Sequence, residues 1–267
     1  FGRVSGRTVC PYAQDFTARA GTLGEMHAKK ICQVMDLAMK IKAPIVGFID
    51  SGGARIQEGI NSLDGYSNIF YRNSLASGVI PQISAIMGPS AGGAVYSPAM
   101  TDFIFMVKKT SYMFITGPAV VKTSIGEEID SESLGGAVTH ATKSGVAQFT
   151  AKTDQEAIDE IKRLLSYLPA SNTEKAPRVE PDDKPDRAEE TLNTILPSSA
   201  NQGYDMKEVI KAIVDGGEFM EPFRQWAPNL VTTFARMNGE VIGIIANQPK
   251  FYAGTLDINA SDKATRF

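Results

Sequence analysis

The sequence predicts an α/β fold: a mostly parallel sheet covered by helices, followed by the beginning of a second unit of the same kind. Short apolar runs alternate with helical patterns over the first 170 residues, as in α/β layer architectures. A charged, proline-rich segment then interrupts the chain, and a stretch near the end repeats one near the beginning. We expect an N-terminal domain over residues 1–170, a linker over 171–203 and the start of a second domain over 204–267.

The spacing of apolar residues places the individual elements. In the segment 24–41, Ile31 and Met35 stand four apart on one helical face, and Pro44 ends that helix. The run IVGFID (45–50) is typical of a buried parallel strand. The other expected strands are 6–16, 81–87, 102–107, 112–117 and a pair between 230 and 246. The other expected helices lie within 63–77, from 94 onward, and over 154–168 and 204–215.

The segment from 174 to 190 is expected to be an exposed linker. Eleven of its seventeen residues are charged, and prolines stand at 177, 181 and 185. A segment of this composition cannot bury an apolar core, and its prolines interrupt regular structure.

An internal repeat relates the two ends of the chain. When residues 239–263 are placed over residues 6–30, at a constant offset of 233, seven of twenty-five positions are identical without a gap. The tetrapeptide AGTL occurs in register at 20–23 and 253–256, and Lys30 meets Lys263. Self-similarity of this kind indicates a duplicated structural unit. The chain is therefore expected to hold most of one α/β unit and only the opening of another.

Composition excludes several classes of protein. The net charge of −3 argues against a general nucleic-acid coat, and no apolar stretch is long enough to span a membrane. Two cysteines, Cys10 and Cys32, are too few for a disulfide framework and indicate a reducing compartment. Only two histidines are present, His27 and His140, and there is no Cys-x-x-Cys motif, so we expect no metal site.

Two glycine-containing turns are the strongest candidates for a site. DSGGAR (50–55) and GPSAGG (88–93) each follow an apolar strand, and α/β sheets bind ligands at the carboxyl ends of their strands. Glycine permits positive φ and close approach of the backbone to a ligand. Two such turns, each leading into a helix, can aim backbone N–H groups at one point, as an oxyanion hole does. The alternative is two tight strand–helix connections without a ligand.

Residues 88–92 also spell the pattern G-x-S-x-G. In that interpretation Ser90 is a nucleophile, and Asp130 and His140 follow it in the order that α/β-hydrolases use. A serine hydrolase is therefore the rival hypothesis, and it predicts covalent labelling of Ser90 by a fluorophosphonate.

Seven segments are long and specific enough to indicate a family. They are DSGGARIQEG (50–59), ASGVIPQISAIMGPSAGGAVYSPAMTDF (76–103), SYMFITGP (111–118), GEEI (126–129), LGGAVTHATKSGVA (134–147), FARMNGEVIGIIANQP (234–249) and LDINASDKATRF (256–267). They resemble the carboxyltransferase (β) subunits of biotin-dependent acyl-CoA carboxylases, most closely the propionyl-CoA carboxylase β chain. The resemblance implies two crotonase-like (ClpP/crotonase) ββα-superhelix domains per subunit, of which this chain contains the first and the start of the second.

The same resemblance implies a role for both turns. In this family, backbone N–H groups polarise the thioester carbonyl of an acyl-CoA, so that its α-carbon can be deprotonated and carboxylated. By position, Gly92 and Gly93 are the expected oxyanion donors. The expected substrate-binding residues are Gly52, Gly53, Ala54, Arg55, Ser90, Ala91, Tyr96, Thr116 and Gly117. Arg55 either orders its turn by a salt bridge or contacts a CoA phosphate. Further candidate phosphate contacts are Lys108, Lys109, Lys122 and Lys143.

The reaction implied by the resemblance is the transfer of a carboxyl group from carboxybiotin to the α-carbon of propionyl-CoA, giving methylmalonyl-CoA, or to a related short acyl-CoA. Methylmalonyl-CoA decarboxylases and transcarboxylases of the same family are the alternative. Biotin is carried on a separate carrier protein or subunit and takes the substrate proton, so the lack of an obvious general base in this chain is expected. No metal takes part in this subunit.

The implied partners are a biotin carboxylase/biotin carrier (α) subunit and further copies of the chain, in a hexamer. The site of this family combines the first domain of one subunit with the second domain of another. Neither nucleic acid nor a membrane is an expected partner. The implied location is the cytoplasm of a bacterium or archaeon, or the mitochondrial matrix of a eukaryote. A non-enzymatic alternative is an inert assembly fragment.

Overall fold

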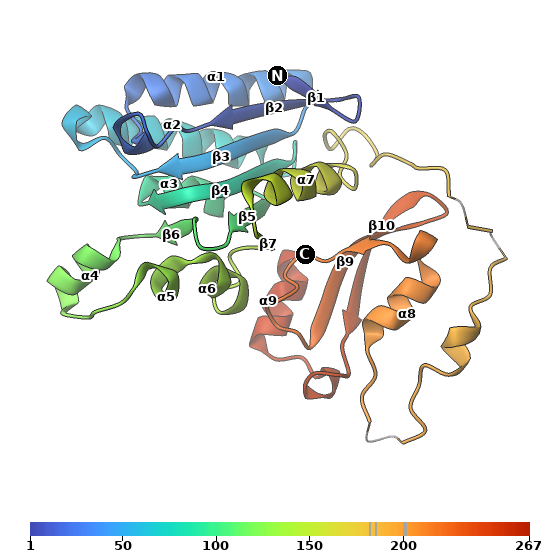
Figure 1. Ribbon diagram of the computed structural model, residues 1–267. Coiled ribbons are helices and arrows are strands. Elements are labelled where there is room, and N and C mark those ends of the chain that lie inside the picture. The colour runs from blue at the N-terminus through green and yellow to red at the C-terminus, as the bar shows by residue number, and fades with distance from the viewer. Residues whose placement is uncertain (182, 185, 200–201) are drawn as a thin grey trace. The chain divides into compact units, whose positions relative to one another are not determined.

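The computed structural model in Figure 1 describes residues 1–181, 183–184, 186–199 and 202–267. The chain divides into two units, Phe1–Lys175 and Ala176–Phe267. The linker predicted over 171–203 includes residues 182, 185, 200 and 201, which lie outside the described residues, and the three-part division with that linker stays a prediction. Each unit has its own sheet and its own apolar core.

A seven-stranded sheet forms the centre of the first unit, in the order β1-β2-β3-β4-β5-β7, with β6 paired to β4. Its strands are β1 Gly2–Val4, β2 Arg7–Ala13, β3 Ile45–Ser51, β4 Gln82–Ala91, β5 Phe103–Val107, β6 Tyr112–Phe114 and β7 Phe149–Ala151. Strands β1 and β2 form an antiparallel hairpin, and all other pairs are parallel. The α/β fold with a mostly parallel sheet is therefore confirmed.

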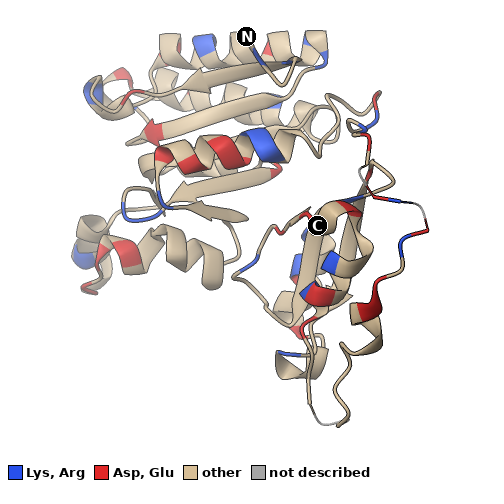
Figure 2. Cartoon of the chain, turned by 45° about the vertical axis from the view of Figure 1, so that its right-hand side comes forward, with Lys and Arg blue, Asp and Glu red and all other residues tan. Residues whose placement is uncertain are grey.

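Helices cover both faces of this sheet. The helices of this unit are α1 Glu25–Ile41, α2 Ile60–Ala76, α3 Gly93–Ala99, α4 Pro118–Ile125, α5 Ser131–Gly135, α6 Ala137–Thr142 and α7 Asp154–Leu165. Successive side chains of a strand point to opposite faces. Accordingly Ile86 joins the core beneath α1 and α2, whereas Met87 packs on the cluster that contains Ala157 of α7. In Figure 2 the strands of this sheet are almost free of charged residues, as expected for strands buried on both faces.

Strand β4 is longer than the sequence predicts. Residues 88–93 were expected to form one turn, but the strand continues through Gly88, Pro89 and Ser90 to Ala91. The cause is a non-local contact, because β6 pairs with this extension in parallel. The turn is reduced to Gly92, whose φ is 55°, and α3 begins at the next residue.

The second unit is built around a three-stranded antiparallel sheet in the order β10-β9-β8. Its elements are α8 Met206–Ile213, β8 Phe219–Met220, β9 Leu230–Met237, β10 Glu240–Asn247 and α9 Ile258–Arg266. Ile210 and Val214 from the α8 region pack on Val231 and Ala235 of β9. Short 3₁₀ turns across the two units lie at Arg19–Gly21, Ile56–Glu58, Glu190–Asn193, Asp215–Gly217 and Tyr252–Gly254.

The backbone confirms the internal repeat residue by residue. The hairpin β1–β2 closes with Val4 opposite Arg7, and the hairpin β9–β10 closes at the same point after adding 233, with Met237 opposite Glu240. Ala20 has a φ of 54° and Ala253 a φ of 53°. A left-handed alanine is uncommon, so its recurrence in register marks a shared backbone path. Helices α1 and α9 then begin at 25 and 258, again 233 apart.

Candidate oxyanion site

The two glycine turns touch at the carboxyl edge of the first sheet. They follow β3 and β4, which are parallel neighbours, so both strands end on the same side. Gly53 has a φ of +95°, and a Cβ placed on it would lie 2.6 Å from the carbonyl oxygen of Ala91. Glycine is required here both by its left-handed backbone and by this contact. The first turn therefore packs backbone against backbone on the end of β4.

A β-bulge brings the two turns to the same level. The register runs regularly to Ile49 opposite Ile86, and then resumes with Ser51 opposite Ser90. An advance of two residues along β3, from 49 to 51, is thus matched by an advance of four residues along β4, from 86 to 90. Bulges of this kind re-aim the ends of strands and are frequent next to functional sites. Ser51 and Ser90 end as fully buried cross-strand neighbours beneath the turns.

The first turn is held by a second strand-like contact and by an ion pair. The N–H of Leu23 donates to the carbonyl of Gly53 at 2.8 Å, and the N–H of Arg55 donates to the carbonyl of Leu23 at 2.9 Å. The Arg55 guanidinium donates to Glu58 Oε1 at 2.8 Å and to the carbonyl of Thr22 at 2.8 Å. Of the two interpretations of Arg55, this geometry favours the one in which it orders its turn.

The second turn leaves one backbone donor free and uses the other. The N–H of Gly92 donates to the carbonyl of Phe114 at 3.0 Å, which continues the pairing of β4 with β6. This bond occupies Gly92, although the sequence nominated it as an oxyanion donor. The N–H of Gly93, at the first position of α3, donates to no other described residue.

The backbone N–H groups of the first turn likewise include bonded groups and one unbonded group. The N–H of Gly52 donates to the carbonyl of Ala20 at 2.9 Å, and the N–H of Gly53 donates to Ser51 Oγ at 3.2 Å. The N–H of Ala54 donates to no other described residue. Each turn therefore offers one uncommitted N–H group, from Ala54 and from Gly93.

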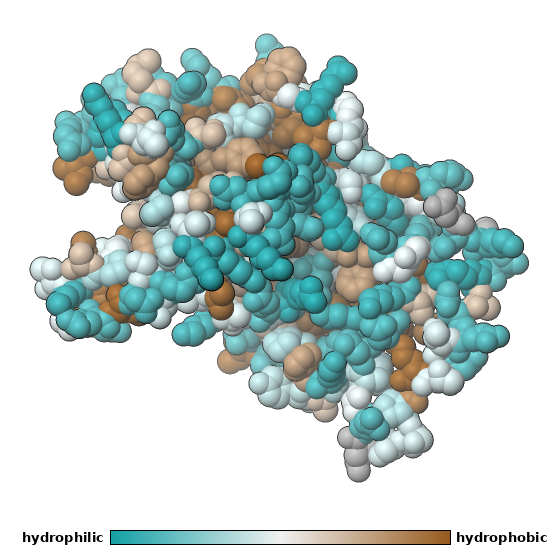
Figure 3. Space-filling view, viewed as in Figure 1, coloured by the Kyte–Doolittle hydropathy of each residue, from teal (hydrophilic) through white to brown (hydrophobic). Residues whose placement is uncertain are grey.

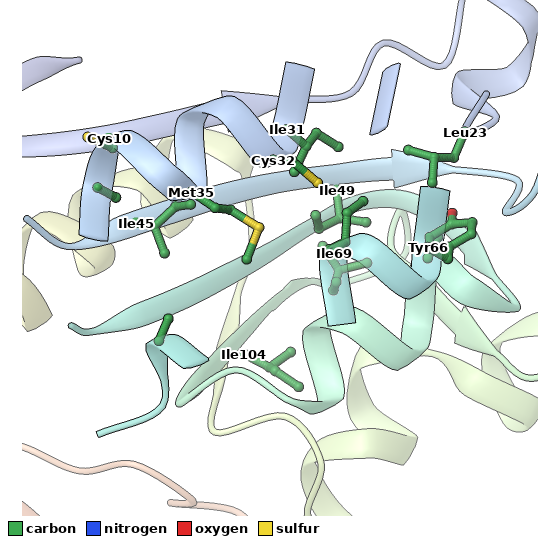
Figure 4. Packing of buried hydrophobic residues seen from close by; sticks show 14 of the residues in the cluster. Cys10, Leu23, Ile31, Cys32, Met35, Ile45, Ile49, Tyr66, Ile69 and Ile104 are labelled. Carbon is green, nitrogen blue, oxygen red and sulfur yellow. The ribbon is translucent and has the colours of Figure 1, made fainter. Parts of the chain in front are cut away.

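An aromatic ring forms the floor of the second turn. A Cβ on Gly93 would lie 2.7 Å from ring carbons of Tyr66, which is 5% exposed on α2. Burial raises the pKa of Tyr66 to about 12, so its phenol is neutral near pH 7. The ring stacks on Phe70 with centroids 5.8 Å apart, and Phe70 meets the half-exposed ring of Tyr96 edge-on at 6.3 Å. Figure 4 shows Tyr66 at one end of the buried cluster, near Ile69 and Leu23.

The serine-hydrolase hypothesis is wrong in geometric terms. Ser90 Oγ is buried and has no hydrogen-bond partner among the described residues. The ring nitrogens of His140 lie 2.9 Å from the Met113 carbonyl and 2.9 Å from Ser144 Oγ. Asp130 instead caps α5 by accepting the N–H of Ser133 at 2.9 Å. No base is in contact with Ser90, so the order Ser, Asp, His in the sequence does not become a triad.

The remaining nominated residues lie further along the edge. Thr116 is exposed and Gly117 caps α4 at its N-terminus, two and three residues beyond the carbonyl that binds Gly92. Helix α4 has no buried residue; its last residue, Ile125, is 71% exposed, and Ile115, which precedes the helix, is 73% exposed. Hydrophobic patches lie over this segment at the lower left of Figure 3. Lys122 forms an ion pair with Glu128, and Lys108, Lys109 and Lys143 are candidates whose contacts with phosphate stay predictions.

Three residues of the site escaped sequence reasoning. Glu58 bridges two elements: Oε1 pairs with Arg55, and Oε2 accepts the N–H of Glu25 at the start of α1, at 2.6 Å. The spacing of three between Arg55 and Glu58 is a signal that could have found it. Tyr66 carried no local signal. The third is Asp50, the residue before the last of β3. Its buried Oδ1 has no partner among the described residues, and burial raises the pKa of Asp50.

The described ranges contain neither a candidate metal site nor a candidate membrane-spanning helix. Among these residues, no cluster of three or more His, Cys, Asp or Glu side chains is placed to ligate a metal ion. Within the same ranges, no helix has the length and apolar character needed to traverse a lipid bilayer.

Comparison with known proteins assigns this architecture. Residues 1–267 match the family described as carboxyl transferase domain. The chain is 59% identical to the methylmalonyl-CoA decarboxylase subunit alpha of Veillonella parvula, over 100% of this chain and 52% of that protein. It is 54% identical to the propionyl-CoA carboxylase beta chain of Roseobacter denitrificans, with the same coverage of 100% and 52%. The chain thus spans about half the length of the curated relatives it matches.

Solved structures agree with this assignment. The crystal structure of transcarboxylase 12S, a hexamer with methylmalonyl-CoA and methylmalonic acid bound, matches with a TM-score of 0.94 at 49% identity, over 98% of this chain and 51% of that one. A single-chain, multi-domain long-chain acyl-CoA carboxylase matches with a TM-score of 0.82 at 26% identity, over 96% of this chain and 24% of that one. The chain therefore belongs to the carboxyl transferase domain family, as its motifs indicated, and it has the crotonase-like α/β fold of acyl-CoA carboxyltransferases.

Proposed function

We propose that this chain carries the acyl-CoA half of a biotin-dependent carboxyltransferase site. The observation that supports it is the pair of touching turns, each with one uncommitted backbone donor, at Ala54 and Gly93. Fixed N–H groups stabilise negative charge on a carbonyl oxygen without reorganising during the reaction. A thioester oxygen that becomes enolate-like during removal of an α-proton is a ligand of this kind.

The chemistry assigned to the chain is positioning and electrostatic stabilisation. Ala54 and Gly93 hold the thioester oxygen, while the aromatic floor of Tyr66 keeps the second turn in place. Arg55 and Glu58 form an ion pair with each other, and this pair holds the first turn in place. Carboxybiotin, when bound, would supply the carboxyl group, and the biotin left after that group departs would accept the α-proton. A site made of backbone donors suits such a cofactor, because the protein itself needs no general base beside the substrate.

The proposed acyl pair is propionyl-CoA and methylmalonyl-CoA. A methylmalonyl-CoA decarboxylase subunit, a propionyl-CoA carboxylase chain and a transcarboxylase with methylmalonyl-CoA bound are all similar to this chain at 49–59% identity. Each of these proteins is described with one of these two thioesters: methylmalonyl-CoA for the decarboxylase and the transcarboxylase, and propionyl-CoA for the carboxylase. We therefore assign the half-reaction that these proteins share. In it, the same propionyl-CoA enolate is formed either by removing a proton from propionyl-CoA or by removing the carboxyl group from methylmalonyl-CoA.

The partners proposed for the full subunit follow from the same relatives. They are a biotin-bearing carrier or biotin carboxylase subunit and further copies of the chain, in a hexamer like the transcarboxylase 12S core. The second unit, whose elements repeat the start of the first, is the proposed beginning of the domain that completes the site. The proposed compartment is the cytoplasm or the mitochondrial matrix, since relatives include bacterial and mitochondrial proteins.

A binding and spectroscopic experiment tests this proposal. The chain is titrated calorimetrically with propionyl-CoA and with free CoA, and the stretch of a ¹³C-labelled thioester carbonyl is recorded by infrared difference spectroscopy. We expect tighter binding of the thioester and a shift of its carbonyl stretch to lower frequency, because hydrogen bonds weaken the C=O bond. Equal affinity for both ligands with an unshifted carbonyl contradicts the proposal.

Two variants of Ala54 test whether its N–H group donates to the ligand. Ala54→Pro removes the N–H group without breaking an internal hydrogen bond, whereas Ala54→Ser keeps it. We expect the proline variant to lose about tenfold in propionyl-CoA affinity, the size of one hydrogen bond, and the serine variant to bind as the parent does. If both variants behave alike while folded, Ala54 does not donate to the ligand.

A further inference from the structure

Tyr66 contacts the second turn through its ring. The atoms that a Cβ on Gly93 would meet are the ring carbons Cδ2, Cε2 and Cγ, at 2.7, 2.7 and 2.8 Å. The φ of Gly93 lies outside the left-handed region, so its backbone would tolerate a side chain. What excludes a side chain at Gly93 is therefore the ring of Tyr66.

The ring has little freedom to move away from the turn. Its neighbour in sequence, Gly65, packs so closely on α1 that a Cβ there would lie 2.7 Å from Cβ of Ala28. On its other side the ring stacks on Phe70. The ring of Tyr66 thus lies between Phe70 of its own helix and the backbone at Gly93, and the helix that carries it packs closely on α1.

The hydroxyl of Tyr66 is buried and lies near Ser51, the last residue of β3. Ser51 lies close enough to act on the pKa of Tyr66, which burial raises and the serine hydroxyl lowers, although no hydrogen bond of ordinary geometry forms. Ser51 Oγ in turn accepts the N–H of Gly53 at 3.2 Å. One side chain from α2 therefore reaches both turns.

We propose that Tyr66 is the positioning residue that sets the two turns relative to each other, and with them the N–H groups of Ala54 and Gly93. This inference rests on the proposed function, because it assigns Tyr66 to the same acyl site. The ring carries the effect on the second turn, since the three atoms nearest to a Cβ on Gly93 are all ring carbons of Tyr66. Tyr66 itself does not touch the substrate.

A double-mutant cycle tests the contact without any ligand. Gly93→Ala forces a methyl group against the ring, so it should lower the thermal midpoint of unfolding in the parent chain. In the Tyr66→Ala background the added methyl has room, and the same change should cost less or raise the midpoint. If Gly93→Ala lowers the midpoint equally in both backgrounds, the ring of Tyr66 is not what excludes a side chain at Gly93, and the inference is overturned. If Tyr66→Ala does not fold, Tyr66→Val, which also lacks the ring, replaces it.

The second experiment reads the geometry of the donors. The shift of the ¹³C-thioester stretch is measured on the folded chain with Tyr66→Phe, Tyr66→Ala and the control Met35→Ala. Met35 is 3% exposed in the same core and lies toward its other end in Figure 4. We expect the parent shift in Tyr66→Phe and Met35→Ala, and loss of most of it in Tyr66→Ala, with a roughly tenfold weaker propionyl-CoA affinity and unchanged free CoA affinity.

The outcomes separate this inference from the proposed function. If the parent chain shows no carbonyl shift, the proposed function fails before any variant is compared. If the parent shows the shift and folded Tyr66→Ala keeps it, the proposed function stands and the role of Tyr66 is wrong. If Met35→Ala loses the shift together with Tyr66→Ala, the effect reflects core stability and the inference is likewise overturned.

Discussion

Gly53 and Ala91 are in backbone contact: a Cβ on Gly53 would lie 2.6 Å from the carbonyl oxygen of Ala91. The two residues are far apart in sequence and belong to the turns after two neighbouring strands. Because Ala91 also belongs to the strand extension that pairs with β6, the contact links the first turn to the opposite side of β4. Any displacement of Gly53 is therefore transmitted to the turn that carries Gly93.

Gly53→Ala should destabilise the protein and weaken thioester binding. The left-handed φ alone costs about 1–2 kcal/mol for a side chain, and the collision with Ala91 adds at least about 1 kcal/mol. Gly78→Ala is the matched control, since Gly78 has a φ of +71° but nothing within 4 Å of its Cβ. Chemical denaturation of both variants, followed by propionyl-CoA titration, measures the difference. Equal losses of unfolding free energy would show that the contact contributes nothing.

Glu58 should make the stability of the first turn depend on acid pH. The bond that its carboxylate accepts from the N–H of Glu25, followed by the Arg55 interaction, lowers the pKa of Glu58 below 4.5. A carboxylate with a lowered pKa in the folded state stabilises above its unfolded pKa, and this contribution disappears as the pH falls through the folded pKa. Glu58→Gln should therefore have a lower thermal midpoint at pH 7 and a shallower decline on acidification. A parallel decline in parent and variant contradicts the assignment.

Local sequence signals predicted the parts of the fold that local physics controls. The spacing of Ile31 and Met35 predicted α1, and the apolar run at 45–50 predicted β3, because amphipathic and buried elements are recorded in consecutive residues. The repeat was visible because AGTL encodes the left-handed step shared by Ala20 and Ala253.

Pairing between segments far apart in the chain determines the features that local sequence patterns did not predict. Gly88 and Pro89 are turn residues by local preference, yet β6 pairs with this segment and keeps it in the sheet. The same pairing uses the N–H of Gly92, so of the two expected donors only Gly93 keeps its N–H uncommitted among the described residues. Tyr66 was missed for a related reason: its role depends on the packing of α2 against the start of α3, which no local pattern reports.

Ser90 should be chemically inert. Its Oγ is buried, with no hydrogen-bond partner among the described residues and no base beside it. A fluorophosphonate should therefore leave the folded chain unlabelled, as judged by intact mass. Ser90→Ala should be neutral or stabilising by up to about 1 kcal/mol, since it removes an unpaired buried hydroxyl. Labelling that disappears in Ser90→Ala would restore the hydrolase hypothesis.

Lys263 and Lys30 occupy the same position of the repeat but have opposite environments. Lys263 is fully buried, and its Nζ donates to the carbonyls of Trp226, Ala227 and Leu230 at 2.9, 3.3 and 2.6 Å. Lys30 is exposed on α1. Burial also lowers the pKa of Lys263 to about 8, which reflects the cost of enclosing its charge.

Lys263→Met should destabilise the second unit strongly, because the buried carbonyls lose their donor. We expect a loss of about 3 kcal/mol or more of unfolding free energy, against less than about 0.5 kcal/mol for the matched change Lys30→Met. Urea denaturation, followed by the fluorescence of Trp226 in the same segment, measures both. A small loss for Lys263→Met would mean that the loop around Trp226 is held by its apolar contacts, and that the buried ammonium is a tolerated cost instead of a support for that loop.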